Sequence, residues 1–256
     1  MKRPGRADMA PLFPPLREFV AERAALITLW HEGSFDPAAL GHEVGLAPRK
    51  RGWAEVILAE NVAVELGHPA TASRAFVLTT SVPGLVQHGD VTLLGPDLDG
   101  MRPQERRPFG QVVLLALRDN ALPDPLELGN LQYLTHRLPG YMVRSVPGRL
   151  WARVSRQARA AGFSLRTLGR ALLAAYLGDF PGVSGVEVVL VTSSALDVAA
   201  LAPVAEQARI LAGANQKLSL TASGEIECAD LSCEACPEKA VCNALRDLVR
   251  ARRRTG

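Results

Sequence analysis

The run VEVVLVT at residues 186–192 is almost continuously apolar. Such a run is typical of a strand that is buried on both faces, as in a sheet covered by helices on its two sides. Other short segments rich in Val, Leu and Thr, bounded by Gly or Pro, also predict strands. These segments are residues 53–66, 73–80, 90–95, 109–118 and 149–155.

Segments with apolar residues at helical spacing separate these strands. The predicted helices cover residues 16–30, 36–45, 124–140, 156–163, 164–181 and 192–213. Asp36 and Ser164 have the residue types that cap helix N-termini, and Gly178 lies near the end of the fifth helix. The alternation of strands with helices longer than ten residues favours an α/β fold. We expect a mixed, substantially parallel sheet with flanking helices and a small C-terminal cysteine-rich metal module.

The same patterns divide the 256-residue chain into three parts. Residues 1–52 are predicted to form an N-terminal helical segment, 53–216 an α/β body, and 217–256 a cysteine-rich module with a terminal helix. No stretch approaches the ~18 consecutive apolar residues of a membrane span, and the N-terminus lacks the apolar run of a signal peptide. These features predict a cytoplasmic protein that has no membrane partner.

Charge and aromatic content argue against a nucleic-acid partner. The chain has 29 basic and 26 acidic side chains, for a net charge of +3, and only 5% aromatic residues. This balance is unlike the strongly basic surface that binds nucleic acid, and few aromatic side chains are present for stacking on bases.

All four cysteines of the chain fall within fifteen positions, with the spacing C-x4-C-x2-C-x5-C. They are Cys228, Cys233, Cys236 and Cys242. Cytoplasmic thiols stay reduced, so a cluster of this kind indicates a metal site rather than a set of disulfides. The C-x2-C pair can present two thiolates to one centre from a tight turn. Pro237 stiffens that turn, and Cys-Pro runs are common at iron–sulfur sites.

A 4Fe–4S cluster takes four thiolates, one for each iron, which is the number that the chain contains. Zinc also accepts four thiolates, but zinc sites more often have two C-x2-C pairs separated by a longer loop. We therefore expect the four cysteines to bind a 4Fe–4S cluster, with zinc as the alternative. The cluster has a redox role, or else the metal, iron–sulfur or zinc, only holds together a segment without a core of its own.

Several carboxylates and histidines outside the cysteine module are weaker candidates. Asp97 and Asp99 follow a predicted strand. Carboxylates in this place either bind a cation or position a ligand, or they accept hydrogen bonds from backbone amides in a turn, which is the interpretation we favour. Glu65 lies in an otherwise apolar strand, which predicts a buried and paired carboxylate. The five histidines are scattered, and each is interpreted as a surface or core residue rather than a metal ligand. They are His31, His42, His68, His88 and His136.

Four segments in order resemble the β-subunit family of the carbon monoxide dehydrogenase/acetyl-CoA synthase complex. They are AENVAVELGHPATASRAF from residue 59, VTLLGPDLDGM from 91, RPFGQVVLL from 107 and GFSLRTLGRALLAAYLGDFPGVSGVEVVLVT from 162. The resemblance covers about residues 59–209. It implies an α/β body and a role in the enzymology of CO, methyl groups and coenzyme A. Members of the family carry a nickel–iron–sulfur centre in a domain that follows this region, where the present chain has its cysteine module.

The chain departs from this family at the nickel site. The family holds its distal nickel with a Cys-Gly-Cys motif, which is absent from this sequence. Four thiolates can build one cubane but cannot also build a nickel pair. We therefore expect an acetyl-CoA-synthase-like iron–sulfur protein that transfers electrons or docks a partner, namely a corrinoid protein, a redox protein or a complex subunit. The alternatives are a non-catalytic scaffold with a structural metal, and acetyl-CoA synthase activity with nickel supplied by a partner.

Overall fold

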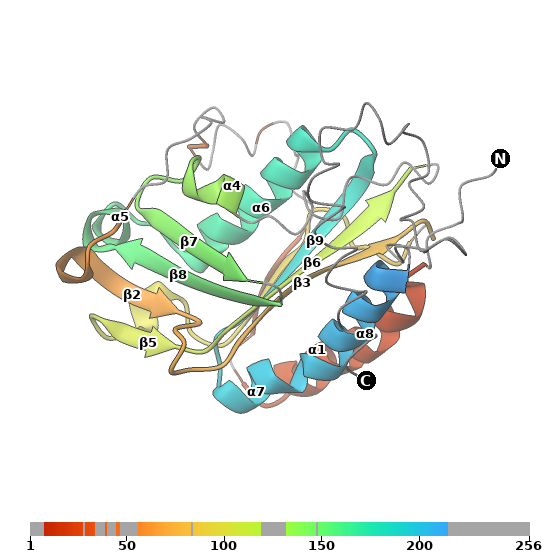
Figure 1. Ribbon diagram of the computed structural model, residues 1–256, viewed down its shortest axis with the longest axis horizontal. Helices are drawn as coiled ribbons and strands as arrows, with labels where there is room; N and C mark the ends of the chain where they lie inside the picture. Colours follow the sequence, from red (N-terminus) through yellow and green to blue (C-terminus); the bar gives the residue numbers. More distant parts are fainter. Residues whose placement is uncertain are drawn as a thin grey trace, which may run out of the picture. The chain divides into compact units, whose positions relative to one another are not determined.

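The computed structural model describes residues 8–27, 29–33, 39, 45–46, 56–82, 84–118, 132–146 and 148–214. The chain divides into two compact units, one being Arg6–Ala212 and the other Met1–Gly5 with Gly213–Gly256. The first unit holds nearly all of the described residues. Its elements form two β-sheets with helices packed against them (Figure 1).

Sheet A has five strands in the order β1-β4-β9-β6-β3. The strands are β1 (Leu29–Glu32), β4 (Val91–Leu94), β9 (Val183–Val191), β6 (Phe109–Leu117) and β3 (Ser73–Thr80). β4 is parallel to β9 and β3 is parallel to β6, whereas β1–β4 and β6–β9 are antiparallel. Residues 186–191 of the apolar run therefore lie in the central strand, in which every residue except Ser184 is buried.

Sheet B has four strands in the order β5-β2-β8-β7. The strands are β5 (Glu105–Arg107), β2 (Val62–Leu66), β8 (Arg149–Ser155) and β7 (Tyr141–Val146). β2 and β5 are parallel, and the other two pairs are antiparallel. Ser73 links the sheets, because its hydroxyl donates to the Leu150 carbonyl at 2.6 Å and accepts from the Leu150 amide at 2.9 Å.

Helices cover both faces of sheet A. α1 (Phe13–Ala24), α7 (Ala195–Ala200) and α8 (Ala202–Ala214) lie along one face, while α6 (Leu165–Asp179) and sheet B lie on the other (Figure 1). The shorter elements are α4 (Gln132–Thr135), α5 (Arg156–Ala160), η1 (Ala10–Leu12), η2 (Ala59–Asn61) and η3 (Leu98–Gly100). No helix in these described ranges is both long and apolar enough to cross a membrane.

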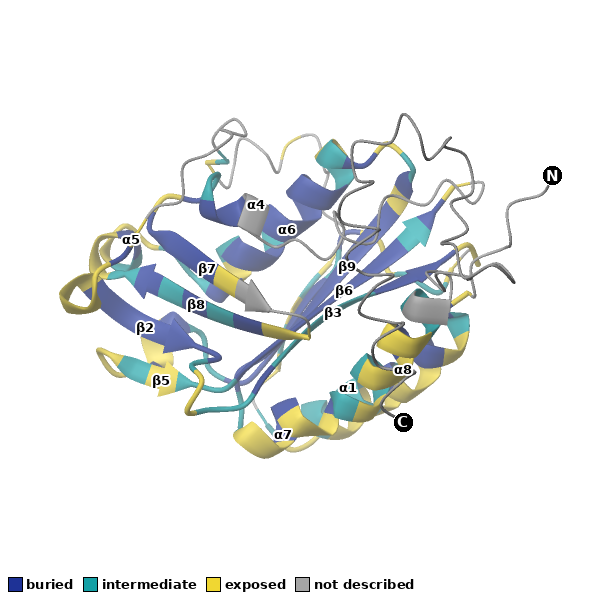
Figure 2. Ribbon diagram, viewed as in Figure 1, coloured by how far each residue is buried: buried dark blue, intermediate teal, exposed yellow. Residues whose placement is uncertain are grey.

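Alternating side chains of sheet A supply two apolar layers, because successive residues of a strand point to opposite faces. Val113 and Leu115 of β6 join the layer that contains α6, whereas Val112 and Leu114 join the layer beneath α1 and α8. Figure 2 shows the strands of sheet A as largely buried and the outward sides of α1, α7 and α8 as exposed. Burial on both faces explains the continuous apolar runs in the sequence.

The α/β prediction with flanking helices is confirmed, but the strands form two mixed sheets where one was expected. Segments 73–80 and 149–155 coincide with β3 and β8. Ser164 caps α6 as predicted, accepting a hydrogen bond from the Thr167 amide at 3.1 Å. In the second sheet, β8 pairs antiparallel with both β7 and β2.

Three predicted elements were wrong in extent, and three strands were not predicted. The helix expected at 16–30 ends at Ala24, since Leu29 and Trp30 pair with β4 instead. Of the strand expected at 53–66, the structure describes residues 56–66, and among these only β2 is a strand, with η2 before it. The helix expected at 192–213 is two helices, α7 and α8, and Pro203 near the start of α8 cannot donate a hydrogen bond back to α7.

The unpredicted strands are β1, β5 and β7. β1 and β5 are short edge strands. β7 is flanked in the sequence by Gly140 and Pro147, and the polar residues Arg144 and Ser145 interrupt its apolar pattern. Of the helix expected at 124–140, the structure describes only the final part, where α4 lies. The helix expected at 36–45 falls almost wholly outside the described residues.

Candidate functional site

The cysteine quartet predicted as the metal site, Cys228, Cys233, Cys236 and Cys242, lies outside the described residues. Within the described ranges, no group of three or more His, Cys, Asp and Glu side chains is arranged to hold a metal ion. Three groups of polar residues stand out there.

The first group is centred on Glu65 of β2, which is 7% exposed. Sheet register places Glu65 between Arg106 of β5 and Arg153 of β8. Arg153 Nε donates to Glu65 Oε1 at 2.8 Å, and Arg106 Nε donates to Glu65 Oε2 at 3.2 Å. His68 Nε2 lies 3.7 Å from the same Oε2. The prediction that Glu65 is buried and paired is confirmed.

Trp151 of β8 extends this group along sheet B. The Arg153 guanidinium lies 4.8 Å from the centroid of the Trp151 ring, and that of Arg144 lies 5.6 Å from it. The His68 ring meets the indole edge to face, with centroids 5.6 Å apart. Cations stack favourably on the electron-rich face of an indole, so the ring helps to hold the two arginines in place.

These residues share one side of sheet B because side chains alternate along each strand. Arg149, Trp151 and Arg153 alternate with buried residues of β8. Arg144 of β7 lies directly opposite Trp151, and Arg106 of β5 lies opposite Glu65. We call this side the basic face. It consists of Glu65, Arg106, Arg144, Arg149, Trp151 and Arg153, so that it carries four guanidinium groups and one carboxylate, which pairs with Arg106 and Arg153.

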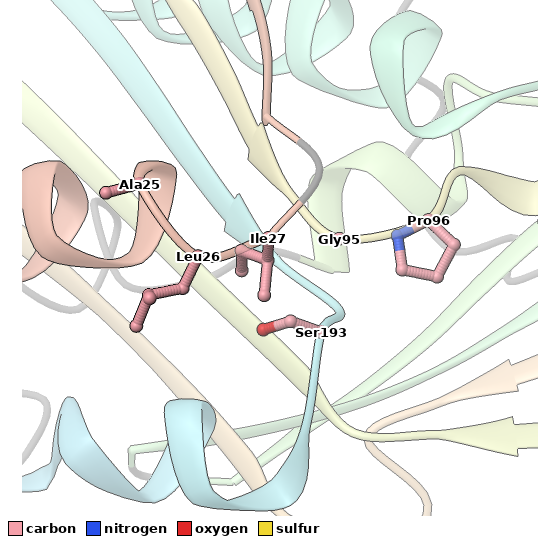
Figure 3. Close-up of a pocket in the computed structure, with 6 residues that line it drawn as sticks. All are labelled: Ala25, Leu26, Ile27, Gly95, Pro96 and Ser193. Atoms are coloured by element: carbon pink, nitrogen blue, oxygen red, sulfur yellow. The ribbon is translucent and has the colours of Figure 1, made fainter.

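The second group lies at the carboxyl ends of β4 and β9, which run parallel and therefore end at the same edge of sheet A. Such an edge is where open α/β sheets usually bind ligands. A pocket of about 520 Å³ is found there, lined by Ala25, Leu26, Ile27, Gly95, Pro96 and Ser193. Figure 3 shows the Ile27 side chain directed toward the Ser193 hydroxyl. The lining is apolar except for that hydroxyl and the backbone.

The Ser193 side chain is fixed by a hydrogen bond to Asp197, four residues further along the chain. Its hydroxyl donates to Asp197 Oδ2 at 2.6 Å, and the Ser194 hydroxyl donates to the same oxygen at 2.7 Å. Arg23 Nε lies 2.8 Å from Asp197 Oδ1, which ties α1 to α7. Gly95 has a φ of +112°, and a Cβ at this position would lie 2.5 Å from the Ser193 amide nitrogen. The close approach of β4 to β9 at the pocket therefore requires glycine at residue 95.

The GPDLDG turn beside the pocket follows the interpretation that we favoured. Asp97 Oδ1 accepts hydrogen bonds from the backbone amides of Leu98, at 2.6 Å, and Leu165, at 2.7 Å. Asp99 Oδ1 accepts from the Gly100 amide at 2.9 Å. Asp97 therefore connects the end of β4 to the first turn of α6, and both carboxylates are used by backbone amides.

The third group was missed by the sequence analysis. Glu187 of β9 is fully buried, and both of its carboxylate oxygens accept hydrogen bonds from the guanidinium of Arg17 in α1. Glu187 Oε2 also accepts from the Gln87 amide at 2.8 Å. The hydrogen bond to Glu187 raises the pKa of Arg17 above its ordinary value. The sequence signal that indicates such a buried, paired residue is a carboxylate in the middle of the apolar run 186–192.

The histidines are dispersed as expected. His31 Nε2 lies 3.0 Å from Asp90 Oδ2 on the surface, and His88 Nδ1 accepts from the Val186 amide at 3.3 Å. His136 Nδ1 is buried without a partner among the described residues. His42 lies outside the described residues.

The sequence of the body matches a family model. The model of the CO dehydrogenase/acetyl-CoA synthase complex beta subunit matches residues 44–196, which is more than half of the chain. The chain belongs to this family. The matched region includes the basic face, the GPDLDG turn, the pocket residues Gly95, Pro96 and Ser193, and Glu187. The four cysteines follow it.

Curated relatives are acetyl-CoA decarbonylase/synthase complex subunits beta from archaea. That of Methanothermobacter thermautotrophicus is 32% identical over 155 residues, which cover 59% of this chain and 32% of the relative. That of Methanopyrus kandleri is 31% identical over 154 residues, which cover 58% of this chain and 32% of the relative. The chain therefore spans only about a third of the length of these family members.

Proposed function

We propose that this chain is an acetyl-CoA-synthase-like iron–sulfur protein of one-carbon metabolism. In this proposal the α/β body docks a partner, and the cysteine module at 217–256 carries one 4Fe–4S cluster that passes electrons or completes the docking site. The partner is a corrinoid protein, a redox protein or a subunit of a larger complex, and the protein works in the cytoplasm. The names of the relatives, which describe subunits of an acetyl-CoA decarbonylase/synthase complex, support this setting.

The observation that carries the proposal is the cysteine spacing C-x4-C-x2-C-x5-C, placed after the family region. A cubane uses one thiolate for each iron, so it would take Cys228, Cys233, Cys236 and Cys242. The chain has no further cysteine with which to hold nickel. Complete synthesis of acetyl-CoA would therefore need metal ligands from a second chain.

Anaerobic purification followed by metal analysis tests the cluster. The expected product is a brown protein with about four iron and four sulfide ions per chain. Cys236→Ser should lower the iron content and the visible absorption, whereas the neighbouring control Ser232→Ala should leave both unchanged. A colourless protein with stoichiometric zinc would exclude the cluster. Nickel bound to this chain alone would favour the acetyl-CoA synthase alternative.

A second measurement separates an electron-transfer role from a structural one. The wild type and Cys236→Ser are compared for reduction by dithionite and for thermal unfolding. Loss of the redox signal with an unchanged unfolding transition of the body supports electron transfer. If the body unfolds together with loss of the metal, and the metal-loaded protein shows no redox signal, the scaffold alternative holds instead.

A further inference from the structure

The basic face of sheet B is an exposed surface with an unusual arrangement of charge. Three of its arginines have substantial access to solvent: the Arg106 side chain is 58% exposed, and Arg144 and Arg149 are exposed as well. We propose that the basic face is the docking surface for an acidic segment of a partner protein. This inference rests on the proposed function, because it names the surface that the partner would contact.

The charge on this face is not balanced within the described part of the chain. Glu65 pairs with Arg106 and Arg153, so one carboxylate serves two guanidinium groups. Arg144 and Arg149 form no ion pair with any described carboxylate. A surface with this excess of positive charge attracts acidic partners and accelerates their encounter at low salt.

The spacing of the charges favours a polypeptide over a single small anion. Arg149 and Arg153 are four residues apart on one strand, which corresponds to about 13 Å. Arg106, Glu65 and Arg153 lie on three adjacent strands, and neighbouring strands are about 4.8 Å apart. A run of carboxylates along an extended acidic segment can reach several of these groups at once.

The composition of the face also fits a protein interface. Arg and Trp are the residue types most enriched at the energetically important centres of such interfaces. Trp151 lies between Arg144 and Arg153, and its indole Nε1 is buried without a hydrogen-bond partner among the described residues. The stack holds the arginines in place before binding, which reduces the entropy that they lose when a partner docks.

The test uses the full chain, purified anaerobically, and a fluorescently labelled peptide of glutamates as the acidic probe. Binding is followed by fluorescence anisotropy at low ionic strength. The charge-reversal variant Arg144→Glu/Arg149→Glu should weaken binding of the peptide by about tenfold or more. The control Arg118→Glu/Arg209→Glu changes the net charge equally, at exposed arginines outside sheet B, and should leave the affinity close to that of the wild type.

Equal losses in the two variants, or no binding by the wild type, would overturn the proposal. Competition by pyrophosphate at the concentration of the peptide would also overturn it, because the face would then be a small-anion site. Iron content is measured for each protein in parallel. Failure of the cluster proposal would appear as absent iron in the wild type, independently of whether the peptide binds.

Discussion

Arg17 and Glu187 are 170 residues apart in the sequence, yet the Arg17 guanidinium donates hydrogen bonds to both carboxylate oxygens of Glu187. The Glu187 side chain is completely buried, whereas that of Arg17 is 32% exposed. Arg17 Nη2 also donates to the Leu85 carbonyl at 3.1 Å. The pair therefore fastens the N-terminal helix to the central strand of sheet A, and the contact with Leu85 adds the segment that precedes β4.

Glu187→Gln tests the importance of this pair. The amide removes the charge that Arg17 faces, so we expect a loss of about 3 kcal/mol in the free energy of unfolding, as for other buried pairs that lose one partner. Urea unfolding followed by circular dichroism measures it. Glu206→Gln, which breaks the exposed pair with Arg209 in α8, is the control and should leave the midpoint unchanged. If Glu187→Gln and Glu206→Gln lowered the free energy of unfolding equally, the buried pair would not stabilise the fold more than the exposed one.

The two arginines that share Glu65 should differ in their contribution to stability. Arg153 is 21% exposed and also donates to the Ile57 carbonyl at 3.0 Å, whereas Arg106 is 58% exposed. We expect Arg153→Met to lower the free energy of unfolding by about 2 kcal/mol, because it removes hydrogen bonds to a buried charge. Arg106→Met should cost less than about 1 kcal/mol. The reverse order in urea unfolding would show that the exposed arginine is the main partner of Glu65.

Two glycines of α6 should respond to alanine in opposite ways. A Cβ at Gly169 would lie 2.3 Å from Val91 Cγ1, whereas a Cβ at Gly178 would have no neighbour within 4 Å. Gly169→Ala should therefore destabilise the protein by about 1–3 kcal/mol through overpacking. Gly178→Ala should stabilise it by about 0.5–1 kcal/mol, since alanine favours the helix. Thermal unfolding of both variants measures the two stability changes. A stabilising effect of Gly169→Ala would disprove the close contact of α6 with β4.

Tyr141 should make the fold sensitive to alkali. Burial raises the pKa of Tyr141 well above its ordinary value, so its phenol stays protonated in the folded protein. The unfolded chain releases this proton near pH ~10. The resulting stability is present below that pH and is lost as the pH rises toward the folded-state pKa.

Tyr141→Phe should therefore flatten the decline in the free energy of unfolding above pH ~10. At neutral pH the change should cost little, because the hydroxyl has no hydrogen-bond partner among the described residues. Tyr176, whose pKa burial also raises, remains in the variant and retains its share of the decline. Urea unfolding at neutral and alkaline pH makes the comparison, and an unchanged slope in Tyr141→Phe would refute the prediction.

Local patterns predicted those elements whose signals are contained within one segment. Segments 73–80 and 149–155 were identified because their residues alternate or favour strands, and α6 because Ser164 caps a strongly periodic helix. The edge strand β5 was missed because its three residues, ERR, carry no apolar signal. The first two residues of β1, Leu29 and Trp30, were assigned to a helix, since only the pairing with the distant β4 makes this segment a strand.

The polar groups, like the strands and helices, could be predicted only where the signal lay within one segment of the sequence. Glu65 was recognised as a buried carboxylate from its apolar neighbours, but its partners Arg106 and Arg153 lie 41 and 88 residues away. Sheet register brings them together, and nothing in the local sequence encodes that register. Glu187 was overlooked although it interrupts an apolar run in the same manner. The basic face likewise appears only when β5, β2, β8 and β7 are placed side by side.

The position of β9 in sheet A has a consequence for biosynthesis. β9 is the last strand of the sheet to be translated, yet it lies between β4 and β6. Before residues 183–191 leave the ribosome, the sheet can exist only as two separate strand pairs, each with an open inner edge of unpaired peptide groups. Such edges recruit other extended chains. A nascent polypeptide that stalls ahead of Val183 is therefore most exposed to aggregation, and its need for chaperones is greatest at that stage of translation.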